Sequence, residues 1–226
     1  MVDKPGGLAV HRSRESRGDE DFALQRLRDQ LGRLVYPVHR LDRATSGALV
    51  FALSPEDAAA AQQALGGAGA LKEYLALVRG ETAARLVSER PLTPRDSDGR
   101  AEGPPQPART DFERVASFSR CSLLEARLES GRRHQVRRHL AHLAHQVIGD
   151  TRYGKGRINA FFRESYGLPR MFLHAHRLRF PHPRGGGEVS VLAPLAPDLR
   201  AFLGRLPDAP CAALSARWGY AACATG

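Results

Sequence analysis

The sequence predicts an α+β fold with a mixed, largely antiparallel sheet, and two observations carry this prediction. Segments of strand type occur in clusters and do not alternate regularly with helical stretches, as they would in a parallel α/β protein. The chain of 226 residues is also long enough for one domain with a substantial core. We expect that domain to span residues 1–206, because residues 207–226 show no clear period and suggest a C-terminal tail.

The first third of the chain predicts two helices around one buried strand. Apolar residues between Phe22 and Leu34 recur at helical spacing. The apolar run 49–53 suggests a buried strand, and Ser54-Pro55 then begins a helix, because Ser is a preferred N-cap and Pro is favoured at the first helical position. We expect that helix to end at Gly66-Gly67.

The middle of the chain predicts two strands, a long loop and a helix. Residues 72–78 alternate as a strand, with Tyr74, Ala76 and Val78 on one face. Residues 93–107 are polar and rich in Pro and Gly, and a loop of this length in a compact domain is either functional or mobile. A second strand is predicted over 122–128, and an apolar stripe from Val136 to Val147 indicates the helix.

The last part predicts a hairpin and a final helix. Residues 173–180 and 188–192 have the composition of strands, and a Pro-Arg-Gly-Gly-Gly turn signal joins them. Apolar residues then return at helical spacing between Leu199 and Leu206.

The charge balance favours nucleic acid as a partner. Lys and Arg number 34 against 24 Asp and Glu, which gives a formal net charge of +10, and most of the cations are Arg. The alternative is a generic solubilising surface. Three distant cysteines argue against a disulfide framework or a thiolate zinc site and fit a reducing cytosol, and neither a signal segment nor a membrane-length apolar run is visible.

Two charged segments are the candidates for chemistry. In residues 39–48, Asp42 lies between Arg40 and Arg43, just before the buried strand. Neighbouring cations favour the ionised carboxylate, which is either a nucleophile or base or else one half of a structural salt bridge. Residues 131–139 predict a helix that presents Arg133, Arg137 and Arg138 outward, suited to phosphates, although a solvated basic face explains the pattern equally simply.

A cluster of histidines raises the question of a metal. His134, His139, His142 and His145 include pairs at helical spacing, but no nearby Cys or Glu completes a recognised set of ligands. We therefore expect no metal site.

Five segments in order resemble the RluA-type pseudouridine synthases. Residues 39–47 (HRLDRATSG) resemble that family's catalytic motif HRLDxxTSG, and residues 72–80 (KEYLALVRG) its second motif. Residues 131–139 (GRRHQVRRH) are similar to GRxHQxRxH, while 147–150 (VIGD) and 173–175 (LHA) match two later markers. The resemblance covers residues 3–195 and implies the pseudouridine synthase catalytic fold with a basic central cleft.

The resemblance also implies roles for individual residues. Asp42 is the catalytic aspartate, held ionised by Arg137, and Arg40 fills the place that the flipped-out nucleotide leaves. Tyr74 stacks on the uracil, where a tyrosine on a strand would otherwise be core or sheet surface. The remaining expected contacts are pocket walls at Val136 and Leu173 and RNA contacts at Arg43, Arg133 and Arg138.

The expected function is isomerisation of one uridine in RNA to pseudouridine, by base flipping and without a cofactor or metal. Residues 103–108, 137–143 and 154–164 are similar to the bacterial tRNA pseudouridine(65) synthase branch, so tRNA is the favoured substrate and ribosomal RNA the alternative. A non-catalytic basic RNA-binding protein and a His-dependent metallohydrolase are the rivals from other classes. We further expect a cytoplasmic monomer and, because the chain starts almost at the family's Asp-Lys-Pro segment, a truncated first strand or a misassigned start.

Overall fold

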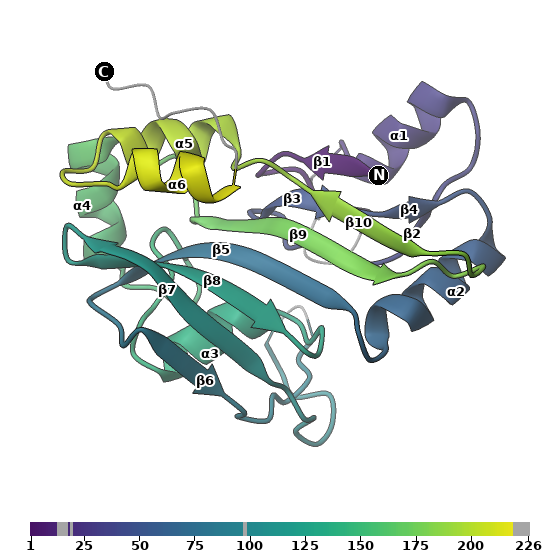
Figure 1. The fold of residues 1–226 in the computed structure, drawn as a ribbon, viewed down its shortest axis with the longest axis horizontal. Coiled ribbons are helices and arrows are strands. Elements are labelled where there is room, and N and C mark those ends of the chain that lie inside the picture. Colours follow the sequence, from purple (N-terminus) through teal and green to yellow (C-terminus); the bar gives the residue numbers. More distant parts are fainter. Residues whose placement is uncertain (13–17, 19, 97–98, 219–226) are drawn as a thin grey trace.

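One large mixed sheet organises the molecule (Figure 1). The computed structural model describes residues 1–12, 18, 20–96 and 99–218. In sheet order, seven strands are β1 (Val2–Lys4), β3 (Ser46–Leu49), β9 (Leu173–Pro181), β5 (Leu71–Arg79), β8 (Cys121–Leu128), β7 (Thr110–Phe118) and β6 (Arg85–Ser88). An eighth, β10 (Glu188–Leu192), pairs with the later part of β9, and β2 (Tyr36–Pro37) pairs separately with β4 (Phe51–Ala52). Among the strands of the described residues only β3 and β9 pair in parallel, which confirms the predicted mixed, largely antiparallel sheet.

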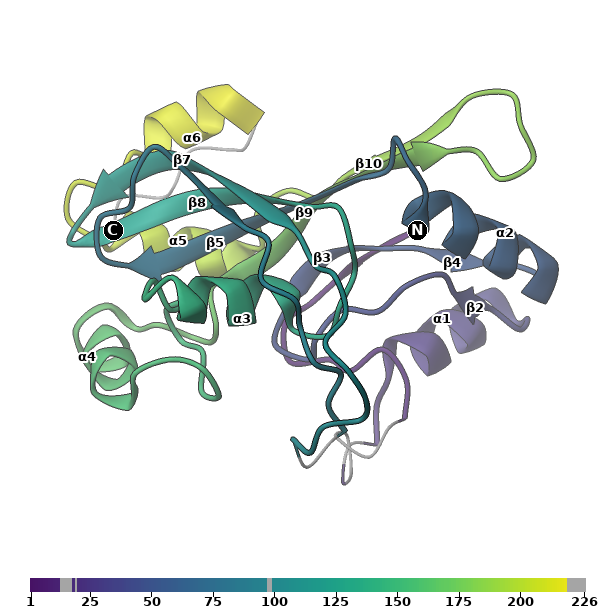
Figure 2. The ribbon, with the colours of Figure 1, turned by 90° about the horizontal axis from the view of Figure 1, so that it is seen from below.

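Six helices flank the sheet within the described residues: α1 (Ala23–Leu31), α2 (Pro55–Gly66), α3 (Gln135–His142), α4 (Gly156–Tyr166), α5 (Pro197–Gly204) and α6 (Cys211–Trp218). Figure 2 shows α3 and α4 on one side of the sheet and α6 on the other. In Figure 1, α4, α5 and α6 gather at one end of the sheet.

The central strand β5 faces a different apolar cluster on each side. Leu75 and Leu77 pack with residues of α4, α5 and α6, whereas Ala76 and Val78 pack with residues of α3. This two-residue alternation is the one that the sequence predicts. As a result β5 is buried on both faces, and its position in the fold is fixed from both sides.

Some elements begin or end elsewhere than predicted, and others were not predicted. The apolar run 49–53 is divided between β3 and β4 at Val50, and α3 ends at His142, because Ala144 has a left-handed backbone (φ +63°) that an α-helix cannot contain. Strands β6 and β7 and helix α4 were not among the predicted elements.

The segment expected as a C-terminal tail contains α6. Leu214 and Trp218 of α6 are buried in the same cluster as Phe202 of α5, so these two side chains belong to the core. Residues 219–226 lie outside the described part of the chain. At the other end, β1 forms an edge strand that pairs with β3.

Candidate active site

A buried lysine stabilises the turn that carries Asp42 through hydrogen bonds to backbone carbonyl oxygens. Lys4 donates through Nζ to the carbonyl oxygens of Pro5 at 2.8 Å, Leu8 at 2.7 Å and Arg43 at 3.2 Å. Burial lowers the pKa of Lys4 to about 7, and the nearby Arg170 lowers it further, while Asp42 opposes this effect. Lys4 therefore ties the N-terminal segment to the turn that presents Asp42.

Glycine is required where the same turn enters β3. The backbone of Gly47 has φ +111°, a conformation that other residues rarely adopt. A Cβ atom there would lie 2.2 Å from the carbonyl oxygen of Ala175, so only glycine lets β9 pass this closely. This contact gives a physical reason for the Thr-Ser-Gly sequence after Asp42.

A single guanidinium joins two carboxylates at the centre of the site. Arg137 of α3 donates through Nη1 to Oδ2 of Asp42 at 2.8 Å. Its Nε and Nη2 bind the two oxygens of Asp150 at 2.7 and 2.9 Å. The side chains of Arg137 and Asp150 are 9% and 1% exposed, whereas that of Asp42 is 24% exposed. Asp150 thus binds two nitrogen atoms of the guanidinium, Nε and Nη2, and leaves Nη1 for the more accessible Asp42.

Asp150 stays ionised although it is buried. Burial raises its pKa, but the hydrogen bond and charge of Arg137, together with the backbone N–H groups of Arg152 and Tyr153, outweigh burial and hold the pKa below its usual value. The guanidinium is stabilised in the same way: burial lowers the pKa of Arg137, yet Asp150 and Asp42 raise it above the ordinary value. Asp150 and Arg137 therefore form a buried ion pair in which both groups are charged.

A neutral histidine faces Asp42 from the other side. His134 is the N-cap of α3 and has a left-handed backbone, with φ 54°. Its Nε2 lies 3.7 Å from Oδ1 of Asp42, and its Nδ1 lies 3.1 Å from the hydroxyl of Tyr153. Burial lowers the pKa of His134 to about 4, so near neutral pH the ring is uncharged and forms no ion pair with Asp42.

Tyr74 reaches the same space from β5. A register irregularity against β9 falls between Glu73 and Tyr74, at the point where this side chain enters the site. Burial, with the charge of Asp42 added, raises the pKa of Tyr74 above its ordinary value. The phenol is therefore protonated near neutral pH and able to donate a hydrogen bond.

These side chains surround a pocket of about 450 Å³. Eight of the nine predicted site residues line it: Arg40, Asp42, Arg43, Tyr74, Arg133, Val136, Arg137 and Leu173. Val136 and Leu173 are buried and form apolar walls, while Arg40 and Arg43 are exposed. The pocket thus combines one accessible carboxylate, apolar walls and cations that are open to solvent.

Comparison with known proteins identifies the family. The family model described as RNA pseudouridylate synthase matches residues 1–142. The chain belongs to the RNA pseudouridylate synthase family. It is therefore an isomerase that converts uridine in RNA to pseudouridine, and the predicted family is confirmed.

Several relatives are similar over most of their length. The chain is 40% identical over 211 residues to tRNA pseudouridine synthase C of Vibrio vulnificus (strain CMCP6), and this alignment covers 85% of each chain. It is 37% identical over 210 residues to the protein of the same name from Salmonella typhi, covering 86% of this chain and 81% of that one. Among solved structures, human RNA pseudouridylate synthase domain containing 1 aligns with a TM-score of 0.69 and 29% identity, covering 89% of this chain and 82% of that one.

Two of the arginines that we expected to contact RNA instead bind backbone carbonyl oxygens of the loop that begins at Thr93. Arg133 donates to the carbonyl oxygens of Arg95 and Asp96, and Arg138 donates to that of Thr93 at 3.0 Å. Arg133 also lines the pocket, but Arg138 does not. The helical spacing expected for Arg133 and Arg137 is not present, because α3 begins only after His134.

Sequence reasoning did not single out His134, Asp150 or Tyr153 as members of the site. Asp150 was visible as the last residue of the 147–150 marker, and His134 lies inside the 131–139 motif. Asp150 and Tyr153 reach the site because the segment after α3 folds back over Arg137, whose guanidinium lies 5.1 Å from the ring centre of Tyr153.

The histidines considered as metal ligands are separated by other contacts. His139 bonds Thr110 Oγ1 at 2.9 Å and the carbonyl oxygen of Arg90 at 3.0 Å, whereas His145 bonds the carbonyl oxygen of Arg79. In the described part of the chain, no group of three or more His, Cys, Asp or Glu side chains is placed to hold a metal ion. No described helix is long and apolar enough to cross a membrane.

Proposed function

We propose that this synthase modifies a uridine in tRNA, with Asp42 as its catalytic residue. The observation that carries the proposal is the Asp42–Arg137–Asp150 arrangement, in which a partly exposed carboxylate is fixed at the wall of the pocket. The name tRNA pseudouridine synthase C, shared by the relatives above, supports tRNA as the substrate, and the sequence resemblance favours position 65.

The reaction breaks the bond between C1′ and N1 of the uridine, turns the free uracil and joins C1′ to C5. The proton on C5 is lost and N1 gains a proton, so no redox step or co-substrate is needed. The carboxylate of Asp42 serves either route to cleavage, attack on C1′ or removal of a proton from the sugar. Val136 and Leu173 exclude water, which would otherwise capture the detached intermediate.

The target uridine must leave the RNA helix before it can reach Asp42. Flipping costs a few kcal/mol, and two side chains of the pocket are placed to offset this cost. Tyr74 offers a ring on which the uracil stacks, and the exposed Arg40 occupies the place that the nucleotide leaves. A protonated Tyr74 is also suited to donate to a uracil oxygen.

We place this activity in the cytosol and in a monomer. Cys121 is a buried free thiol, which fits a reducing compartment. Asp42, Tyr74 and Arg137 come from three segments of one chain, so the pocket is formed without a second copy.

Mapping of pseudouridine tests the substrate assignment. Total RNA from cells with and without the gene is compared at single-nucleotide resolution, and we expect one tRNA uridine to lose its modification when the gene is deleted. Restoring the gene should restore the signal, whereas a gene encoding Asp42→Asn should not. Loss of a ribosomal RNA site with all tRNA sites intact would contradict the tRNA proposal.

A further inference from the structure

A second hollow lies outside the pocket that contains Asp42. It has a volume of about 510 Å³ and is lined by Arg79, Lys155, Arg157, Ile158 and Phe161, none of which lines the first pocket. We call these five residues the α4 patch, because four of them lie on α4 or immediately before it.

The cations of the α4 patch have no acidic partner. Among the described residues, Arg79 has one weak side-chain contact, with Oε1 of Gln146 at 3.5 Å, and neither Lys155 nor Arg157 forms an ion pair. Many other arginines of this chain are paired, such as Arg170 with Asp198 and Arg184 with Asp57. The surface of the hollow is almost wholly apolar, so these three residues line it with their carbon stems and their charged groups lie outside it. Three cations that form no ion pair and are gathered in this way attract an anion.

An exposed aromatic ring lies among these cations. Phe161 is 52% exposed, and its ring contacts Phe162 and Tyr166 edge-to-face at 5.5 and 5.8 Å between ring centres. A single exposed apolar residue is common on protein surfaces. A rigid ring surrounded by three cations is the combination that single-stranded nucleic acid binds, because bases stack on the ring while phosphates contact the charges.

Two segments lead from the Asp42 pocket to the patch. Strand β5 carries Tyr74 in the pocket and Arg79 in the patch, a separation of about 17 Å at the usual rise of a strand. The segment after Asp150 likewise reaches Lys155 within five residues. At this separation one RNA molecule is long enough to contact both sites.

We propose that the α4 patch binds a second segment of the RNA whose uridine is modified, with an unpaired base on Phe161 and its phosphates on Arg79, Lys155 and Arg157. The inference rests on the proposed function, because it takes the substrate RNA as the ligand. Its effect is on affinity and on the choice between RNAs, since the patch does not touch the reacting atoms.

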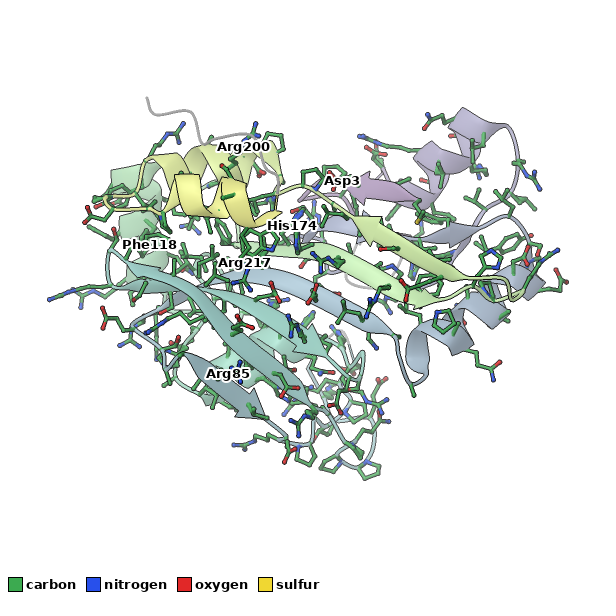
Figure 3. All side chains as sticks on the ribbon, viewed as in Figure 1. Asp3, Arg85, Phe118, His174, Arg200 and Arg217 are labelled. Atoms are coloured by element: carbon green, nitrogen blue, oxygen red, sulfur yellow. The ribbon has the colours of Figure 1, made fainter. Side chains whose placement is uncertain are left out.

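The test compares two double variants that remove equal charge. Lys155→Gln/Arg157→Gln removes two cations of the patch, and Arg85→Gln/Arg200→Gln removes two cations from β6 and α5 (Figure 3). We expect the first variant to raise KM for full-length tRNA at least tenfold with little change in kcat, and to lower the slope of log Kd against log salt by about 1.4–1.8. The control should change KM less than twofold.

A stem-loop that contains only the target uridine and its immediate neighbours separates the patch from the pocket. The native protein should prefer full-length tRNA to the stem-loop, and Lys155→Gln/Arg157→Gln should lose that preference. Phe161→Ala should weaken tRNA binding about fivefold or more, because a base loses its stacking partner.

Equal effects of the two double variants, or unchanged tRNA binding by Phe161→Ala, would overturn the inference. Failure of the proposed function is seen separately, because in that case the native protein forms no pseudouridine in either RNA.

Discussion

At the scale of single residues, the site depends on how one guanidinium is divided between two carboxylates. Asp150 binds two donors of Arg137 and is itself fixed by two backbone N–H groups. The remaining nitrogen atom, Nη1, then donates to Asp42 in a fixed direction, because the guanidinium cannot turn. A planar fork is needed for this arrangement, because a lysine offers a single charge that cannot serve both carboxylates in fixed directions.

The first prediction concerns the fork itself. Arg137→Lys keeps the charge but loses the planar geometry, so we expect kcat to fall about 100-fold, the cost of misplacing a reacting group by about 1 Å. Steady-state kinetics on tRNA transcript provide the measurement. Activity equal to that of the native protein would show that Arg137 does not orient Asp42.

The second prediction concerns the partner behind Arg137. Asp150→Asn should also lower kcat by about 10–100-fold and leave KM almost unchanged, because Arg137 loses the carboxylate that fixes it. The matched control is Asp57→Asn. Asp57 lies on α2, and its carboxylate forms an exposed ion pair with Arg184. If both variants lost the same activity, Asp150 would have no specific role in orienting Arg137.

At the scale of elements, a clamp connects α5 to the turn that carries Asp42. Arg170 donates to the carbonyl oxygen of Ala44 at 3.1 Å and to the hydroxyl of Ser46 at 2.9 Å, and it pairs with Asp198 of α5. The hydroxyl of Ser46 also contacts Nδ1 of His174 on β9 at 2.9 Å. The turn is therefore held by groups from β9 and α5 as well as by Lys4.

The third prediction concerns α6, which packs far from Asp42. Trp218 is buried and its ring lies 5.2 Å from that of His176. Trp218→Ala should lower the free energy of unfolding by about 3–5 kcal/mol, the usual cost of removing a buried aromatic side chain. Urea denaturation measures this change, and a loss below 1 kcal/mol would show that α6 is not part of the core.

The elements differ in how well their sequences predict them. Helix α2 has an N-cap serine whose hydroxyl accepts from Asp57 N at 3.1 Å, and it ends at glycine, so both ends were predicted. The alternation of Leu75, Ala76, Leu77 and Val78 likewise predicted both faces of β5. Here local chemistry and tertiary packing agree.

Where the prediction failed, the missing information was tertiary. Strand β7 alternates poorly because several of its side chains are only partly buried, and α6 shows only Leu214 and Trp218 as an apolar pair four residues apart. In the site, motif residues could be named from the sequence, and the structure brings Asp42, Tyr74 and Arg137 together. The loop contacts of Arg133 and Arg138 and the neutral His134 depend on backbone geometry that spacing alone does not show.

At the scale of the whole molecule, buried histidines make stability depend on pH. Burial lowers the pKa of His174 and of His176 from 6.5 to about 4, and both side chains are fully buried. Between pH 4 and 6.5 the unfolded chain therefore binds more protons than the folded one, so stability rises with pH across this window and is lost as the pH falls through it. Above pH 6.5 these groups add no further dependence.

The fourth prediction follows from this sign. The free energy of unfolding should fall by several kcal/mol between pH 7 and pH 4.5, since each pKa unit of difference corresponds to about 1.4 kcal/mol. Urea denaturation at a series of pH values measures the slope, and His176→Phe should reduce it. A free energy of unfolding that stays constant over this range would contradict neutral burial of these histidines.

The central claim is that Asp42, held by Arg137, performs the isomerisation. Pseudouridine formation removes the proton from C5, so release of tritium from tRNA labelled at C5 of uridine reports each turnover directly. The account predicts release by the native protein and none by Asp42→Asn, although that variant binds the same tRNA with nearly the same Kd. Tritium release by Asp42→Asn at the native rate would contradict it.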